Sequence, residues 1–320
     1  MKKKVLYLVL CLTIALSIVV GATVPAFAAE EGAGDVKVAV QMYNFLVGGD
    51  LFDAEAGVEA DKDTVVAALT EVAAMGYDGV EFANLFPGTQ FYGIDPAELK
   101  GIMEELGLGI AGTHYHANWL STDEDIDAVI EANVAVGSKR IIFAYSVPEE
   151  GQSNEDWLAY INGIVDNMKA RVAEAGADIE VLYHNHGDEF MPMSDEDDSF
   201  VMDNITSDFY EIDLYWASRG LGNTEAAVEW ANNNADKIHL LHIKDGDLTT
   251  DFSEAGAVMP WGGGEMPLQE FVDVARNSTG IEWVVVENDT PAGHDGHNAL
   301  EDAKESIDYI KENIDLTRAA

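Results

Sequence analysis

The sequence is poor in cysteine and in basic residues. Its single cysteine, Cys11, lies in an apolar run near the N-terminus, so we expect no disulfide and no thiol chemistry in the mature chain. Lysine and arginine together number 17 against 59 aspartate and glutamate residues, and the formal net charge is −42. Because this charge repels phosphate backbones and anionic membranes, we expect no nucleic-acid partner and, after cleavage of an N-terminal signal, no membrane.

The sequence also lacks a Gly-x-Gly-x-x-Gly motif after its first predicted strand, which argues against dinucleotide binding. It has no short-period repeat, and no linker rich in proline or serine divides it. Hydrophobic residues make up 48% of the chain, which excludes general disorder. A chain of 320 residues therefore suits one large α/β domain.

The N-terminus is typical of a secretory signal peptide. Three lysines, Lys2–Lys4, precede an apolar run, and Ala26-Phe27-Ala28 gives a small–x–small cleavage pattern. A retained membrane anchor is the alternative. We expect a secreted, periplasmic or cell-envelope protein. The predicted segments are a signal peptide at 1–28, a short acidic lead at 29–35 and the folded domain at 36–320.

Beyond the lead, short apolar runs alternate with segments of helical spacing. For example, Lys62–Met75 has a helical pattern that stops at Gly76, and Asp95-Pro96 begins another helix. The predicted strands are 36–40, 79–82, 108–113, 140–145, 179–185, 209–214, 238–243 and 283–287. Eight strands alternating with helices predict a single (β/α)8 TIM barrel, an α/β fold, rather than an open doubly wound sheet.

Ionisable residues gather where the predicted strands end. Five of the eight histidines follow or close three of these strands. A TIM barrel carries its chemistry at the carboxyl ends of its strands, so these side chains are candidates for one site. They are His114, His116, His184, His186, Glu189, Asp213, His242, Lys244, Glu287 and Asp289.

Four motifs carry a family resemblance. Tyr183–Phe190 (YHNHGDEF), Asp213–Trp216, Leu241–Asp245 and Val286–Asp289 occur in an order and at a spacing that resemble the sugar phosphate isomerase/epimerase family, the xylose isomerase-like barrels. The resemblance runs from Gln41 to the last strand. It is specific for the superfamily and not for a substrate.

This resemblance implies a divalent metal bound by Glu, Asp, His and Glu from strands five to eight. The matches to the last three places are Asp213, His242 and Glu287. The first place departs from the family, because His184 stands where glutamate is usual. Either His184 is the ligand, or Glu189 reaches in from the following loop, and His186 is a third candidate. A mechanism with two glutamates is therefore in doubt.

Imidazole and carboxylate ligands favour Mn, Co, Fe or Zn over Ca, and Mg stays among the candidate ions. Such an ion polarises a carbonyl and stabilises an enediolate once the neighbouring C–H loses its proton. We expect Glu287 to be the base, His184 or His186 to be its counterpart, and Lys244 to stabilise an oxyanion.

Four residues are predicted to bind substrate: His114, His116, Glu81 and Trp216. For one of the two histidines, the alternative is a packing role. For Glu81, the alternative is an ion pair with Lys or Arg inside the barrel. We interpret His294 and His297 as parts of a solvated loop. The segment 261–265 (WGGGE) is either a lid over substrate or a connector.

The leading hypothesis is a secreted, metal-dependent sugar isomerase or epimerase that acts through an enediolate. A free sugar or glycoside is the expected small carbohydrate partner, because a secreted protein meets few sugar phosphates. The first alternative is a lyase that eliminates the aglycone of a 3-keto-glycoside, and the second is a non-catalytic carbohydrate-binding barrel. The oligomeric state is left open, a homo-oligomer included.

Overall fold

The computed structural model describes residues 34–47, 51–53, 58–59, 61–84, 90–144, 146–194, 197–251, 257–289 and 298–319. They belong to a compact unit, Gly34–Ala320. The predicted signal peptide, most of the acidic lead, His294 and His297 lie outside the described residues. Within these ranges, every helix is too short or too polar to cross a bilayer.

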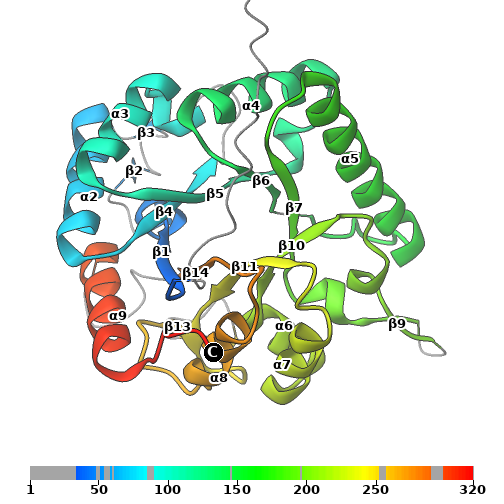
Figure 1. Cartoon of the computed structure of the whole chain (residues 1–320). Helices are drawn as coiled ribbons and strands as arrows, with labels where there is room; N and C mark the ends of the chain where they lie inside the picture. The colour runs from blue at the N-terminus through cyan, green and yellow to red at the C-terminus, as the bar shows by residue number, and fades with distance from the viewer. Residues whose placement is uncertain are drawn as a thin grey trace, which may run out of the picture. The chain divides into compact units, whose positions relative to one another are not determined.

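Eight parallel strands close into a barrel in chain order, with the last strand paired to the first (Figure 1). They are β1 (Lys37–Gln41), β4 (Gly79–Asn84), β5 (Gly109–Tyr115), β6 (Arg140–Phe143), β7 (Glu180–His184), β10 (Phe209–Asp213), β11 (Ile238–Ile243) and β14 (Trp283–Val286). This confirms the predicted (β/α)8 fold, and the strand ends differ from the predicted ones by at most two residues.

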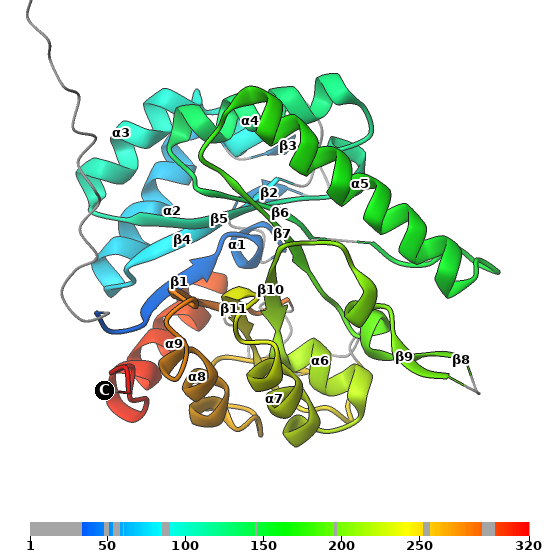
Figure 2. The same ribbon diagram turned by 45° about the vertical axis from the view of Figure 1, so that its right-hand side comes forward.

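Helices surround the barrel (Figures 1 and 2). They are α1 (Tyr43–Val47), α2 (Lys62–Met75), α3 (Pro96–Leu106), α4 (Asp123–Val136), α5 (Asn154–Ala175), α6 (Leu214–Leu221), α7 (Thr224–Asn233), α8 (Leu268–Arg276) and α9 (Ala299–Asn313). The predicted signals act as expected: the Asp95 side chain caps α3, and Gly76 ends α2 at a φ of 89° that favours glycine.

Short elements extend the loops. There are 3-10 turns η1 (Gln90–Gly93), η2 (Ala117–Trp119), η3 (Asp188–Phe190) and η4 (Met202–Asn204). Three small two-stranded sheets pair β2 (Phe52–Asp53) with β3 (Val58–Glu59), β8 (Pro192–Ser194) with β9 (Asp197–Phe200), and β12 (Asp245–Gly246) with β13 (Val258–Met259).

Side chains inside the barrel form layers. A small apolar cluster includes Ala39, Leu182, Leu240 and Val285. Because side chains alternate along a strand, the residue two places further on points into the barrel again. Those next residues are Gln41, His184, His242 and Glu287. The polar site therefore begins directly above an apolar floor.

The segment after β13 is fixed by one buried carboxylate. Asp245 accepts hydrogen bonds from the backbone N–H groups of Gly246 (2.9 Å), Gly262 (2.8 Å), Gly264 (3.0 Å) and Met266 (3.0 Å). Four bonds to one charged group hold the backbone in place. Of the two predicted roles for this segment, the geometry favours the connector.

Candidate active site

A cavity of about 930 Å³ opens at the carboxyl ends of the barrel strands. Its walls combine ionisable side chains from β5, β7 and the segment after β14 with an aromatic side chain from α6. Among the residues that line it are His114, His116, His184, His186, Trp216 and Glu287. With Asp289, which also lines it, seven of the residues predicted from the sequence therefore meet in one place, at the mouth where a barrel carries its site.

The first group of the site, the histidine group, consists of His114, His184, His242, Glu211 and Glu81. His114 Nε2 lies 2.5 Å from Glu211 Oε2 and 2.6 Å from Glu81 Oε1. His184 Nδ1 lies 2.9 Å from Glu211 Oε2, and His242 Nε2 lies 2.8 Å from Glu81 Oε1. All five side chains are buried.

Glu211 has a role that the sequence analysis missed. It lies two residues before Asp213 on β10, so both side chains point into the barrel. In the sheet it pairs with His184 of β7, and Asp213 pairs with His242 of β11. The two-residue spacing from Asp213 could have shown that Glu211 shares its face of the strand. The register that makes Glu211 a partner of His184, however, depends on how two strands far apart in the sequence pair.

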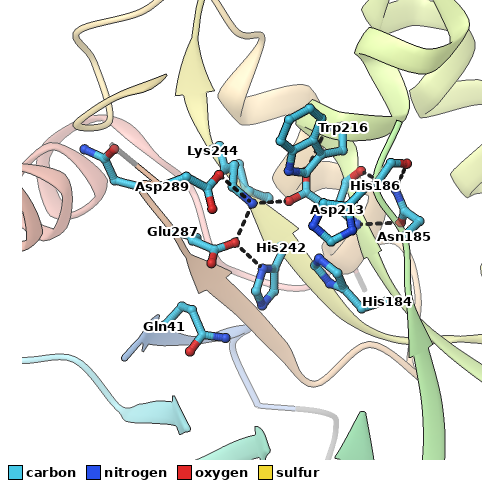
Figure 3. Close-up of polar contacts among 12 residues, drawn as sticks. Gln41, His184, Asn185, His186, Asp213, Trp216, His242, Lys244, Glu287 and Asp289 are labelled. Carbon is cyan, nitrogen blue, oxygen red and sulfur yellow. Dashed lines mark hydrogen bonds and ion pairs between the residues drawn. The ribbon is translucent and has the colours of Figure 1, made fainter. Parts of the chain in front are cut away.

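The second group, the lysine group, consists of Lys244, Asp213, Glu287 and Asp289 (Figure 3). The Lys244 ammonium donates to Asp213 Oδ2 and to Glu287 Oε2, and it lies 3.3 Å from Asp289 Oδ2. His242 links the two groups, because its Nδ1 lies 3.0 Å from Glu287 Oε2.

Electrostatics differ within the histidine group. Burial alone would lower the pKa of His114, but Glu81 and Glu211 outweigh it and raise that pKa to about 9. The same carboxylates raise the pKa of His242. Burial, with His242 and His114 nearby, lowers the pKa of His184. Burial and the charge of Glu81 raise the pKa of Glu211. For Glu81 itself, His114 and His242 outweigh burial and lower the pKa.

In the lysine group, burial opposes the charge of Lys244, but Asp213, Asp289 and Glu287 outweigh it and raise its pKa well above the ordinary value. Lys244 and His242 likewise overcome burial and hold the pKa of Glu287 low. Burial, reinforced by Glu287, raises the pKa of Asp289 to about 7.

Two of the predicted residues lie elsewhere than expected. Glu189 is buried beside the site, where its carboxylate accepts from the Tyr183 hydroxyl (2.7 Å) and the His186 N–H (2.9 Å). It is not among the grouped donor atoms of the described residues that suit a metal. Glu81 is not among the residues that line the cavity, and it pairs with His114 and His242 and with no Lys or Arg of the described residues; its Oε1 also accepts from Gln41 Nε2 at 2.6 Å.

The remaining predicted contacts line the cavity. Trp216 lies with its ring 5.5 Å from that of His186, a tilted arrangement that leaves both at the wall. Burial lowers the pKa of His116 to about 4 and that of His186 to about 3, so both rings are neutral near pH 7. Neutral rings can donate and accept hydrogen bonds, which suits contacts with sugar hydroxyls.

The site has donor atoms that fit a divalent metal. Two sets of donors within the described residues lie within 4.8 Å of one another: His114, His184, Glu211 and His242; and Asp213, His242 and Glu287. Imidazole mixed with carboxylate suits Zn, Fe, Co or Mn. Within the described part of the chain, Glu81 Oε2 accepts no hydrogen bond, and Glu211 Oε1 lies 3.3 Å from His242 Nε2 without accepting one.

The chain is similar to known proteins in sequence and in structure. A family model described as xylose isomerase-like TIM barrel matches residues 69–313. No curated protein matches the sequence. A sugar phosphate isomerase/epimerase from Parabacteroides distasonis has a similar structure, with a TM-score of 0.67, 22% identity, and coverage of 91% of this chain and 99% of that one.

Two further structures are similar at lower identity. The IolI protein with a bound zinc atom has a TM-score of 0.59 and 13% identity, over 86% of this chain and 97% of that one. A probable 3-DHS dehydratase from Bacillus anthracis has a TM-score of 0.57 and 14% identity, over 87% of this chain and 99% of that one. At these identities the similarity shows the fold.

Proposed function

Because the chain belongs to the xylose isomerase-like TIM barrel family, we propose that it is a metal-dependent isomerase or epimerase of a small carbohydrate. The family fold hosts several chemistries, so the proposal depends on the side chains. The observation that carries it is the meeting of the histidine group and the lysine group at one cavity.

In the proposed reaction, Glu287 removes the proton from the carbon next to the carbonyl, and an enediolate forms. Glu287 lines the cavity, and so do His184 at the end of β7 and His186 in the loop after it, which are the candidates for the group that returns the proton. Lys244 supplies a fixed positive charge for a developing oxyanion. A divalent ion, when bound, supplies a Lewis acid for the carbonyl.

The charges around the cavity support a neutral sugar or glycoside. Asp188, Glu287 and Asp289 line it, and Arg219 is the one lysine or arginine among its described lining residues. Arg219 Nη1 already donates to the Tyr215 hydroxyl and to the Thr250 carbonyl, each at 3.1 Å. The charge of His114, the other positive group of the lining, is matched by Glu81 and Glu211, so the described lining residues offer a phosphate no free positive side chain, which disfavours its binding.

A second candidate is the 3-keto-glycoside lyase. Val147 and Met191 line the same cavity yet stay 45% and 47% exposed. Exposed apolar side chains at a cavity mouth suit an apolar aglycone, which a free sugar lacks. The same base would remove the proton beside the 3-keto group, and the aglycone would leave in place of proton return.

One experiment separates these functions. The metal-loaded protein is incubated in D₂O with free aldoses and ketoses, and separately with a 3-keto-glucoside, and products are followed by NMR. Deuterium next to the carbonyl, lost in Glu287→Gln, supports the isomerase or epimerase. Released aglycone identifies the lyase. Binding of sugars with neither exchange nor elimination would overturn both and leave the carbohydrate-binding barrel.

A further inference from the structure

The metal position implied by the family pattern is filled by a side chain of the protein itself. Lys244 is 1% exposed, and its ammonium lies between Asp213 and Glu287, the two carboxylates that the pattern assigns to the metal (Figure 3). A divalent cation between the same two carboxylates would stand beside the ammonium, at a distance where like charges repel strongly.

In the histidine group, one ring nitrogen has two carboxylate partners and a single hydrogen to share between them. Each imidazole nitrogen carries at most one hydrogen. Yet His114 Nε2 faces oxygens of both Glu81 and Glu211, and Glu211 Oε2 is also approached by His184 Nδ1. One donor atom from each of His114, His184, Glu211 and His242 lies within 4.8 Å of the others, a spacing that allows all four to reach a common cation.

The orientation of His242 points the same way. Its Nε2 faces the histidine group, 2.8 Å from Glu81 Oε1, while its Nδ1 lies 3.0 Å from Glu287 Oε2. A metal-bound histidine commonly donates its other ring N–H to a carboxylate, which fixes the ring. Glu287 takes this supporting position if Nε2 is the ligand atom.

We infer that the divalent metal is bound by His114, His184, His242 and Glu211, with Glu211, the inward-facing residue before Asp213 on β10, as its carboxylate ligand, and that the Lys244 ammonium replaces a cation between Asp213 and Glu287. This deepens the proposed function and rests on its metal dependence; with His184 on the metal, His186 is the group that returns the proton. His114 and His184 also line the cavity, so the metal is reached from the substrate side.

X-ray absorption of the wild-type protein loaded with one equivalent of Zn²⁺ tests the ligand set without any substitution. We expect scattering from three imidazoles. A single imidazole with carboxylate oxygens would overturn the inference while leaving a metal-dependent function standing. If Zn²⁺, Co²⁺ and Mn²⁺ all fail to bind, the metal dependence of the proposed function falls as well.

Matched variants test the same assignment by affinity. We expect Glu211→Gln to weaken Zn²⁺ binding at least 10-fold, and Asp213→Asn to change it less than 3-fold, in protein whose circular dichroism matches wild type. Equal losses would overturn the inference.

Replacing the ammonium tests the second half of the inference. Lys244→Met frees Asp213 and Glu287, so we expect the bound metal, measured by elemental analysis, to rise from one to two equivalents. Lys237→Met, at an exposed position, is the control and should stay at one. One equivalent in Lys244→Met would show that Lys244 does not replace a cation.

Discussion

At the scale of single residues, Lys244 is the side chain on which the site's balance of charge depends most. Its ammonium is buried and meets three carboxylates, Asp213, Glu287 and Asp289. Removing one partner of a buried ion pair leaves the other charges without compensation, which costs more than the pair itself contributes.

Lys244→Met should therefore destabilise the metal-free protein. We expect the free energy of unfolding to fall by about 3 kcal/mol, because the buried carboxylates lose their cation. Urea titration in a chelating buffer measures this change. Lys237→Met should match wild type, and an equally stable Lys244→Met would show that the three carboxylates need no ammonium.

Glu189 should make stability depend on pH. Burial raises its pKa to about 7 from an ordinary 4.5, so folding favours its protonated form. The contribution of Glu189 to the free energy of unfolding is fully present below pH 4.5 and is lost as the pH rises through 7. Glu189→Gln should flatten the fall in unfolding free energy across this range, by about 1.4 kcal/mol for each unit of pKa difference removed.

Urea titrations at several pH values measure this slope for wild type and Glu189→Gln. The control is Glu131→Gln, at an exposed position on α4, which should keep the wild-type slope. A steeper fall in Glu189→Gln than in wild type would contradict the expected direction of the pH dependence.

At the scale of elements, strand and helix positions could be predicted from the sequence, but the register between strands could not. Apolar runs and glycine stops are local signals, and they located β11 and the end of α2 at Gly76. Which side chains face one another depends on pairing, such as Glu211 with His184. For this reason Glu211 went unassigned, although the strand that contains it was predicted.

Asp245 shows how one residue holds an element. Asp245→Ala removes the acceptor for four backbone N–H groups. We expect a loss of about 3 kcal/mol in unfolding free energy, since bonds to charged groups contribute more than neutral ones. Faster proteolysis within 260–266 should accompany it.

Asp247→Ala is the matched control for this prediction. The Asp247 carboxylate accepts its hydrogen bonds from the nearby Thr249 and Thr250, so it ties together only neighbouring residues of one loop. Its loss should lower the free energy of unfolding much less than the loss of Asp245, because water can replace these local bonds. If both variants were equally stable, the fixed connector would be refuted.

At the scale of the whole molecule, we propose that the chain is exported. The support is in the sequence: a basic start, an apolar run and the Ala26-Phe27-Ala28 pattern. Expression of the full chain in a bacterial host should give a product that begins at Ala29, as determined by intact-mass spectrometry of the secreted or periplasmic fraction. An unprocessed chain in the membrane fraction would favour the anchor.

The central claim is that side chains far apart in the sequence hold one divalent ion at the floor of the barrel cavity. Anomalous diffraction from crystals of the metal-loaded protein tests it most directly. We expect one strong peak in contact with His114, His184, His242 and Glu211. A peak between Asp213 and Glu287, or none at all in fully loaded crystals, would contradict it.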